Sequence, residues 1–179
     1  MIGGADLAGA VEKLRALHAE AGTVSGRGLE ALIAGATLGV SKQTWLFPGR
    51  REAGAALLRG ASADALHTAR PYRVVPAGTS PSARAGQAVG MGMAGENALC
   101  FLGTGSAAYG TLAEVLGHLT PGVQFVVSWY DKPGPFTLPV SPAGMFVAAG
   151  HTVAEVDGSD VLAVFEAVRA GNALIIARV

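Results

Sequence analysis

Apolar positions follow a helical period in the first third of the chain. Residues 7–21 carry Leu7, Val11, Leu14 and Leu17 at helical spacing, with charged residues between them, which predicts an amphipathic helix. The same spacing predicts a helix over residues 28–36. Residues 39–47 lack this period and are expected to be irregular or strand-like, and short helices are expected over residues 53–59 and 63–69.

Continuous apolar runs replace the helical period after residue 95. Such runs, bounded by glycine and proline, predict buried strands, and helical patterns lie between them. The strands are expected at 98–102, 123–129, 153–156 and 173–179, and the helices at 107–119, 143–150 and 161–170. This alternation predicts an α/β fold with a parallel sheet and helices on both faces. Residues rich in proline and glycine predict loops over 74–82 and 132–142.

A glycine turn in the middle of the chain carries the clearest candidate chemistry. Residues 103–108 read Gly-Thr-Gly-Ser-Ala-Ala and follow a predicted strand, and Asp131 follows the next strand. Such a turn points backbone N–H groups at a phosphate. The pattern also fits the dinucleotide fingerprint, so an oxidoreductase that binds a nicotinamide dinucleotide is one interpretation. Against it, the fingerprint usually opens its domain, whereas this copy lies in mid-chain.

Composition adds an expectation about assembly. The 179 residues are 50% hydrophobic and only 15% charged, whereas about 25% charged residues is usual. A chain of this length predicts one domain, and its apolar excess predicts burial against a partner, most simply in a homo-oligomer. Residues 83–94 contain several glycines, which allow another backbone to approach closely. Candidates for the interface or a pocket beside it, with the protein's own core as the alternative, are Met91, Met93, Trp129 and Tyr130.

Several functional classes lack support in the sequence. The net charge is zero, so binding to nucleic acid or to an anionic membrane is not expected, and no apolar run is long enough for a membrane span. Cys100 lies in an apolar strand and is expected to be a buried core thiol. The four histidines have no metal-ligand spacing, and a Gly-x-Ser-x-Gly elbow is absent. The lone cysteine and the lack of a visible targeting segment favour a cytoplasmic location.

Four ordered segments resemble the diphosphate-binding (PP) domain of thiamine diphosphate enzymes, most closely the E1 α subunit of 2-oxoacid and acetoin dehydrogenases. Residues 156–168 resemble the family's V-D-G-N-D-V-L-A-V-Y-E-A-V, residues 137–141 its S-T-P-V-S, and residues 100–105 its C-F-F-G-D-G. Arg51 falls on the arginine of its Y-R-x-H-G-H-A-L segment. The resemblance implies a three-layer sandwich with a mostly parallel sheet, formed as a single PP-type domain over residues 1–179. The resemblance itself runs from about residue 45 to the end of the chain. Residues 1–44 form a helical N-terminal part that the resemblance does not cover.

The resemblance also implies a cofactor site and shows where this chain departs from the family. Thiamine diphosphate would be bound by Arg51, Gly103, Thr104, Gly105, Ser106 and Asp131, with a weak Mg²⁺ site at Thr104 and Asp131. Thr104 stands where the family has the metal-binding acid, and Mg²⁺ prefers hard, charged oxygen ligands. The family's glutamate is Tyr109 here, and its two histidines are Ala53 and Ala55.

Three functions remain open on this basis. The chain is the diphosphate-binding half of a thiamine diphosphate-dependent 2-oxoacid decarboxylase or dehydrogenase, or of a transketolase-like enzyme, with a degenerate metal site. Its partner is then a β-like subunit with the pyrimidine-binding domain. Alternatively, it is a non-catalytic module of the same fold, a pseudoenzyme that serves assembly or binds a phosphorylated metabolite. The nicotinamide interpretation is the second alternative. No residue of this chain is assigned a catalytic role.

Overall fold

A computed structural model describes residues 2–21, 28–62, 72–76, 80–105, 110–130 and 141–179. Its centre is a five-stranded sheet in the order β1-β2-β3-β5-β4, and every strand pair is parallel. The strands are β1 (Trp45–Phe47), β2 (Ala98–Gly103), β3 (Val123–Trp129), β4 (Val153–Asp157) and β5 (Leu174–Arg178). The predicted α/β class with a parallel sheet is therefore confirmed.

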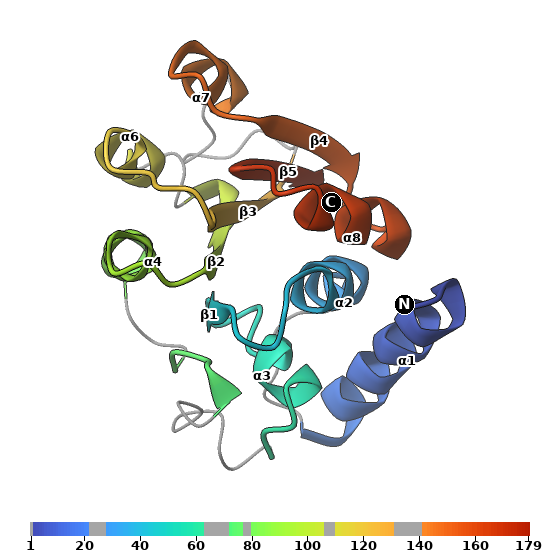
Figure 1. Cartoon of the computed structure of the whole chain (residues 1–179). Helices are drawn as coiled ribbons and strands as arrows, with labels where there is room; N and C mark the ends of the chain where they lie inside the picture. Colours follow the sequence, from blue (N-terminus) through green and yellow to red (C-terminus); the bar gives the residue numbers. More distant parts are fainter. Residues whose placement is uncertain (1, 22–27, 63–71, 77–79, 106–109, 131–140) are drawn as a thin grey trace.

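Helices cover both faces of this sheet (Figure 1). One face carries α1 (Gly4–Ala21), α2 (Glu30–Gly39), α3 (Gly54–Leu58) and α8 (Val161–Arg169), and the other carries α4 (Pro81–Met93), α6 (Thr111–Leu116) and α7 (Ala143–Ala148). Successive strand residues point to opposite faces, so Leu99 and Phe101 pack under the first group of helices, whereas Cys100 and Leu102 pack under the second. The two apolar clusters make the three-layer sandwich that the resemblance implied.

Most predicted elements are present within a few residues of their expected bounds, but the helix expected over residues 107–119 is not continuous. Thr104 and Gly105 are already helical at the end of β2, and Gly110 then takes a left-handed conformation with φ of 78°. α6 begins only at Thr111 and ends at Leu116. Glycine adopts positive φ without steric cost, so Gly110 interrupts the helix that the alanine-rich pattern predicted.

Two segments that were predicted as loops contain regular structure. Val74, expected in a loop, forms a parallel bridge with Leu46 and so protects the edge of β1. α4 starts at Pro81, within the predicted loop, because the Ser80 hydroxyl accepts a hydrogen bond from Ala83 N and caps the helix. The helix predicted over 63–69 lies outside the described residues, as does most of the loop predicted over 132–142. Among the described residues, no helix has the length and apolar character needed to cross a membrane.

Close contact between α2 and α8 depends on Gly35. A Cβ atom at this position would lie 2.6 Å from the Val161 carbonyl oxygen and 2.9 Å from Val164 Cβ. We expect Gly35→Ala to lower the free energy of unfolding by about 1–3 kcal/mol, because α8 must move away. Gly9→Ala on α1, where a Cβ atom would meet nothing within 4 Å, is the control and should gain about 0.5–1 kcal/mol. Equal effects of the two changes in urea titrations would contradict this packing.

Candidate functional site

The carboxyl ends of β1, β2 and β3 form the edge at which the predicted site residues gather. Since neighbouring parallel strands end at the same edge of the sheet, the segments that follow them lie together. Gly103 ends β2 and is followed by Thr104 and Gly105, and Arg51 follows β1. Four of the predicted residues are therefore at one edge. Ser106 and Asp131 lie outside the described residues.

Thr104 connects β2 to the end of β3. Its hydroxyl donates a hydrogen bond of 2.9 Å to the Ser128 carbonyl oxygen and accepts one of 2.8 Å from the Tyr130 backbone N–H. The side chain is only 7% exposed. The sequence indicated Thr104 as a substituted metal ligand, but gave no sign of this bridge. The bridge fixes the backbone of Tyr130 next to the glycine turn.

Tyr130 in turn contacts Arg51. The guanidinium carbon of Arg51 lies 5.1 Å from the centroid of the Tyr130 ring, a distance at which a cation is attracted to the face of an aromatic ring. Arg51 follows β1 and Tyr130 follows β3, and β2 lies between these strands. The contact therefore brings a positive charge across the end of β2, where the glycine turn begins. Tyr130, expected to line an interface or a pocket, is part of this edge.

A buried pair of opposite charges lies beneath the turn after β1. Glu52 is 5% and Arg84 is 6% exposed. A Cβ atom at Gly49 would lie 2.5 Å from Glu52 Oε2 and 3.2 Å from Arg84 Nη2, so a larger residue there would displace the ends of these two side chains. Burial raises the pKa of Glu52 above its usual value, while the positive charges of Arg84 and then Arg51 oppose this rise. The sequence did not indicate this pair, because the two residues belong to separate elements.

Cys100 lies near the same two charges and is fully buried. Burial raises the pKa of its thiol to about 12. This effect of burial is larger than the opposing effect of the positive charge on Arg84. The thiolate is the reactive form of cysteine, so Cys100 stays protonated and inert at neutral pH. The prediction of a core thiol is confirmed.

The described residues fit an anion at this edge better than they fit Mg²⁺. Mg²⁺ requires several hard oxygen ligands in octahedral geometry, and the Thr104 hydroxyl is neutral and already bonded on both sides. The Glu52 carboxylate lies beneath Gly49 and faces Arg84. Within the described ranges, His, Cys, Asp and Glu side chains form no group of three that could hold a metal ion. By contrast, Arg51 supplies a positive charge, and a Cβ atom at Gly105 would meet nothing within 4 Å.

The structural role of Thr104 predicts a measurable loss of stability. Thr104→Val keeps the shape of the side chain but leaves the Ser128 carbonyl and the Tyr130 N–H without this partner. We expect the free energy of unfolding to fall by about 1–3 kcal/mol. Thr104→Ser retains the hydroxyl and is the matched control. A valine variant as stable as the serine variant in denaturant titrations would show that the bridge contributes nothing.

The other residues that the sequence singled out lie elsewhere. Trp129 is 6% exposed and packs in the protein's own core, the alternative considered for it, whereas Met93 on α4 is 69% exposed. Met91 is partly buried and lines a cavity of about 390 Å³ beside Trp45 and Phe47. His118 is exposed and His151 precedes β4. Neither histidine is at the carboxyl edge of β1–β3.

Comparisons with known proteins identify the fold. No protein-family model and no curated protein matches the chain. Among solved structures, transketolase from Campylobacter jejuni superposes with a TM-score of 0.67 at 13% identity, over 96% of this chain and 36% of that one. A 2-oxoglutarate:ferredoxin oxidoreductase from Magnetococcus marinus superposes with a TM-score of 0.53 at 18% identity, over 84% of this chain and 28% of that one.

These similarities define the class of protein by its fold: the chain has the thiamine diphosphate-binding fold. It spans about a third of the length of the transketolase it matches. The finer resemblance to an E1 α subunit and the roles of the individual site residues stay predictions. The activity and partners of the longer enzymes come to this chain only as proposals.

Proposed function

We propose that this chain is the diphosphate-binding half of a thiamine diphosphate-dependent enzyme of the 2-oxoacid dehydrogenase or transketolase-like type. In this proposal the diphosphate is held by Arg51 and the turn at residues 103–105, with little contribution from Mg²⁺. The observation that carries it is the placement of the Arg51 guanidinium over Tyr130, at the same edge of the sheet as Gly105, where a Cβ atom would meet nothing within 4 Å. Arginine is suited to phosphate groups because its planar fork donates two parallel hydrogen bonds.

Each residue at the edge has a distinct part in this proposal. Arg51 binds the diphosphate, and the turn from Gly103 to Gly105 offers backbone N–H groups to it. Thr104 holds the Tyr130 backbone, and the Tyr130 ring supports the Arg51 guanidinium. Ser106 and Asp131 complete the proposed set. A Mg²⁺ ion bound weakly between Thr104 and Asp131 is the competing prediction.

Catalysis in this proposal also requires a pyrimidine-binding domain. When bound, thiamine diphosphate supplies carbanion stabilisation through its own ring chemistry, and the resemblance assigns activation of the aminopyrimidine to a separate pyrimidine-binding domain. The chain spans only 36% of the matched transketolase. We therefore propose a β-like subunit as its partner, with a homo-oligomer of this chain as the simplest assembly without it.

A calorimetric titration that compares thiamine diphosphate with thiamine tests the proposal. The two ligands differ only in the diphosphate. A protein that recognises this group should therefore bind thiamine diphosphate at least about tenfold more tightly than thiamine, which is the gain in affinity expected from one charge-assisted hydrogen bond. Equal binding of both ligands, or binding of neither in the presence of a pyrimidine-domain subunit, would overturn the proposal. Arg50→Gln, a change at the neighbouring arginine, is the control for nonspecific charge effects.

A non-catalytic module is the second candidate, and the positions of two alanines favour it. Ala53 and Ala55 stand where the resembling family has histidines, and Ala55, a residue of α3, is fully buried in the core. If the chain binds thiamine diphosphate but never turns over a 2-oxoacid with any pyrimidine-domain subunit, this candidate replaces the enzyme half. Enhanced NADH fluorescence on titration is the corresponding test for the nicotinamide alternative.

A further inference from the structure

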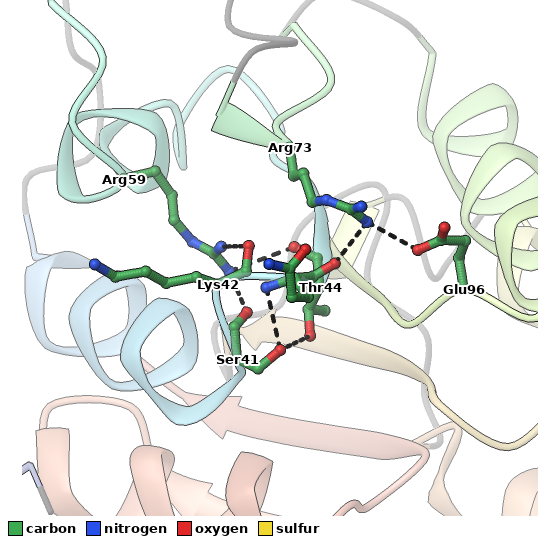
Figure 2. A network of polar contacts seen from close by, with 7 residues as sticks. Ser41, Lys42, Thr44, Arg59, Arg73 and Glu96 are labelled. Carbon is green, nitrogen blue, oxygen red and sulfur yellow. Dashed lines mark hydrogen bonds and ion pairs between the residues drawn. The ribbon is translucent and has the colours of Figure 1, made fainter.

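Two arginines hold the loop that leads from α2 into β1, as Figure 2 shows. Arg59 donates hydrogen bonds to the carbonyl oxygens of Lys42 at 2.7 Å and Ser41 at 2.9 Å. Arg73 reaches the same loop and donates to the Gln43 carbonyl at 2.9 Å. This loop precedes β1, so it lies at the amino end of that strand. The site proposed above lies at the carboxyl end.

The two arginines differ in how their charge is balanced. Arg73 forms an ion pair of 2.8 Å with Glu96, whereas the hydrogen bonds of Arg59 go to neutral carbonyl groups. Within the part of the chain that the structure describes, no carboxylate is paired with Arg59. Burial lowers the pKa of Arg59, as expected for a charge removed from water without a counter-ion.

A second positively charged residue, Lys42, contacts Arg59 through its backbone carbonyl. Figure 2 shows the Lys42 side chain extended away from the hydrogen bonds of the loop. Lys42 is exposed and, like Arg59, is in no ion pair among the described residues. Two positively charged side chains that line one cavity without carboxylate partners attract an anion from solution.

Both cationic residues line a cavity of about 320 Å³. Thr37 also lines it, and this side chain is only 2% exposed while its hydroxyl has no hydrogen-bond partner. A buried polar atom without a partner is unusual and needs an explanation. The rest of the lining is mainly apolar and consists of Ile2, Leu38, Val40, Leu58 and Gly60.

We propose that this cavity binds a small organic anion with an apolar body, such as a short-chain carboxylate or phosphate monoester. Lys42 and Arg59 receive the anionic group, the Thr37 hydroxyl gains a partner, and the aliphatic side chains cover the apolar body. Ligand sites of this kind combine apolar walls with a few polar groups that fix orientation. The competing explanation is that the two positive charges only stabilise the carboxyl end of α2, where the helix dipole attracts positive charge.

Binding is measured by NMR titration of the full chain with hexanoate and with hexyl phosphate, and hexylammonium and hexanol are the matched controls. Saturable shifts in the amides of Thr37, Leu38 and Leu58 with either anion, and not with the controls, are expected. The anion with the higher affinity identifies the preferred head group. Absence of saturation by both anions, or equal binding of hexanol, would overturn the proposal.

Two variants test the residues of the cavity without disturbing the loop. Lys42→Met should weaken the binding of the preferred anion by at least about fivefold, because one charged contact is lost, and Thr37→Val should weaken it without lowering stability. Lys13→Met, a change at an exposed lysine of α1, should leave binding unchanged. Unchanged affinity in Lys42→Met would show that the two cations serve the helix end alone. Because the cavity and the diphosphate site lie at opposite ends of β1, failure at one does not imply failure at the other.

Discussion

Arg84→Met is expected to lower the free energy of unfolding by about 3–5 kcal/mol, because it leaves the buried Glu52 carboxylate without its closest positive charge. Glu52 is only 5% exposed and lies beneath Gly49, so its carboxylate is largely shielded from solvent. Arg15→Met is the control, since Arg15 is an exposed residue of α1. The double variant Glu52→Gln/Arg84→Met removes both charges and should recover most of the loss.

The pH dependence of this effect follows from the pKa of Glu52. Burial raises this pKa in the folded protein, so the folded state holds the proton more tightly than the unfolded state. The stabilisation that comes from this bound proton is present at pH values below the pKa of Glu52 in the unfolded chain. It is lost as the pH rises through the pKa of Glu52 in the folded protein. Without Arg84 the pKa of Glu52 rises further, so the destabilisation by Arg84→Met should increase as the pH rises above the usual pKa of a glutamate. A loss of stability independent of pH, with no recovery in the double variant, would contradict a buried ion pair.

Arg51→Gln is expected to weaken the binding of thiamine diphosphate by about ten- to a hundredfold, the effect of losing charge-assisted hydrogen bonds to a phosphate. Affinity for thiamine, which has no diphosphate, should not change. Arg51 is exposed but contacts Tyr130 and acts on the charge of Glu52, so a denaturant titration of the variant shows first that it is still folded. Isothermal titration with both ligands measures the difference.

Arg50→Gln is the matched control for this experiment. Arg50 precedes Arg51 and is also exposed, but the contact with Tyr130 belongs to Arg51. If both glutamine variants weakened binding equally, the effect would be one of general charge and not of a guanidinium held over Tyr130.

The architecture could be predicted because buried strands and amphipathic helices have different periods. The runs at 98–102 and 123–129 became adjacent central strands, and the helix expected over 161–170 is present as α8. The interruption at Gly110 could not be predicted, because a glycine in an alanine-rich segment is compatible with both a helix and a left-handed turn. Local patterns thus predict the elements better than the points at which they end.

The candidate site was predictable only where sequence order places residues at strand ends. The turn at 103–105 was located in this way, whereas Arg51 was assigned from the family resemblance, and both lie at the same edge of the sheet. The bridge from Thr104 to Ser128 and Tyr130 was not predicted, nor was the Glu52–Arg84 pair. These contacts join segments that are far apart in the chain, so no short sequence motif predicts them.

The metal dependence of cofactor binding tests the central claim most directly. Thiamine diphosphate is titrated into the natural protein and into Thr104→Asp, each with excess Mg²⁺ and again with a chelator. We expect the natural protein to bind with affinities that differ by less than about threefold between the two conditions, because the neutral Thr104 hydroxyl is already bonded on both sides. Thr104→Asp adds a hard oxygen ligand but cannot donate to the Ser128 carbonyl, so a denaturant titration shows first that it is folded; the folded variant should gain affinity only with Mg²⁺. Binding by the natural protein that disappears on chelation would contradict the claim that Arg51 and the glycine turn hold the diphosphate without a bridging metal.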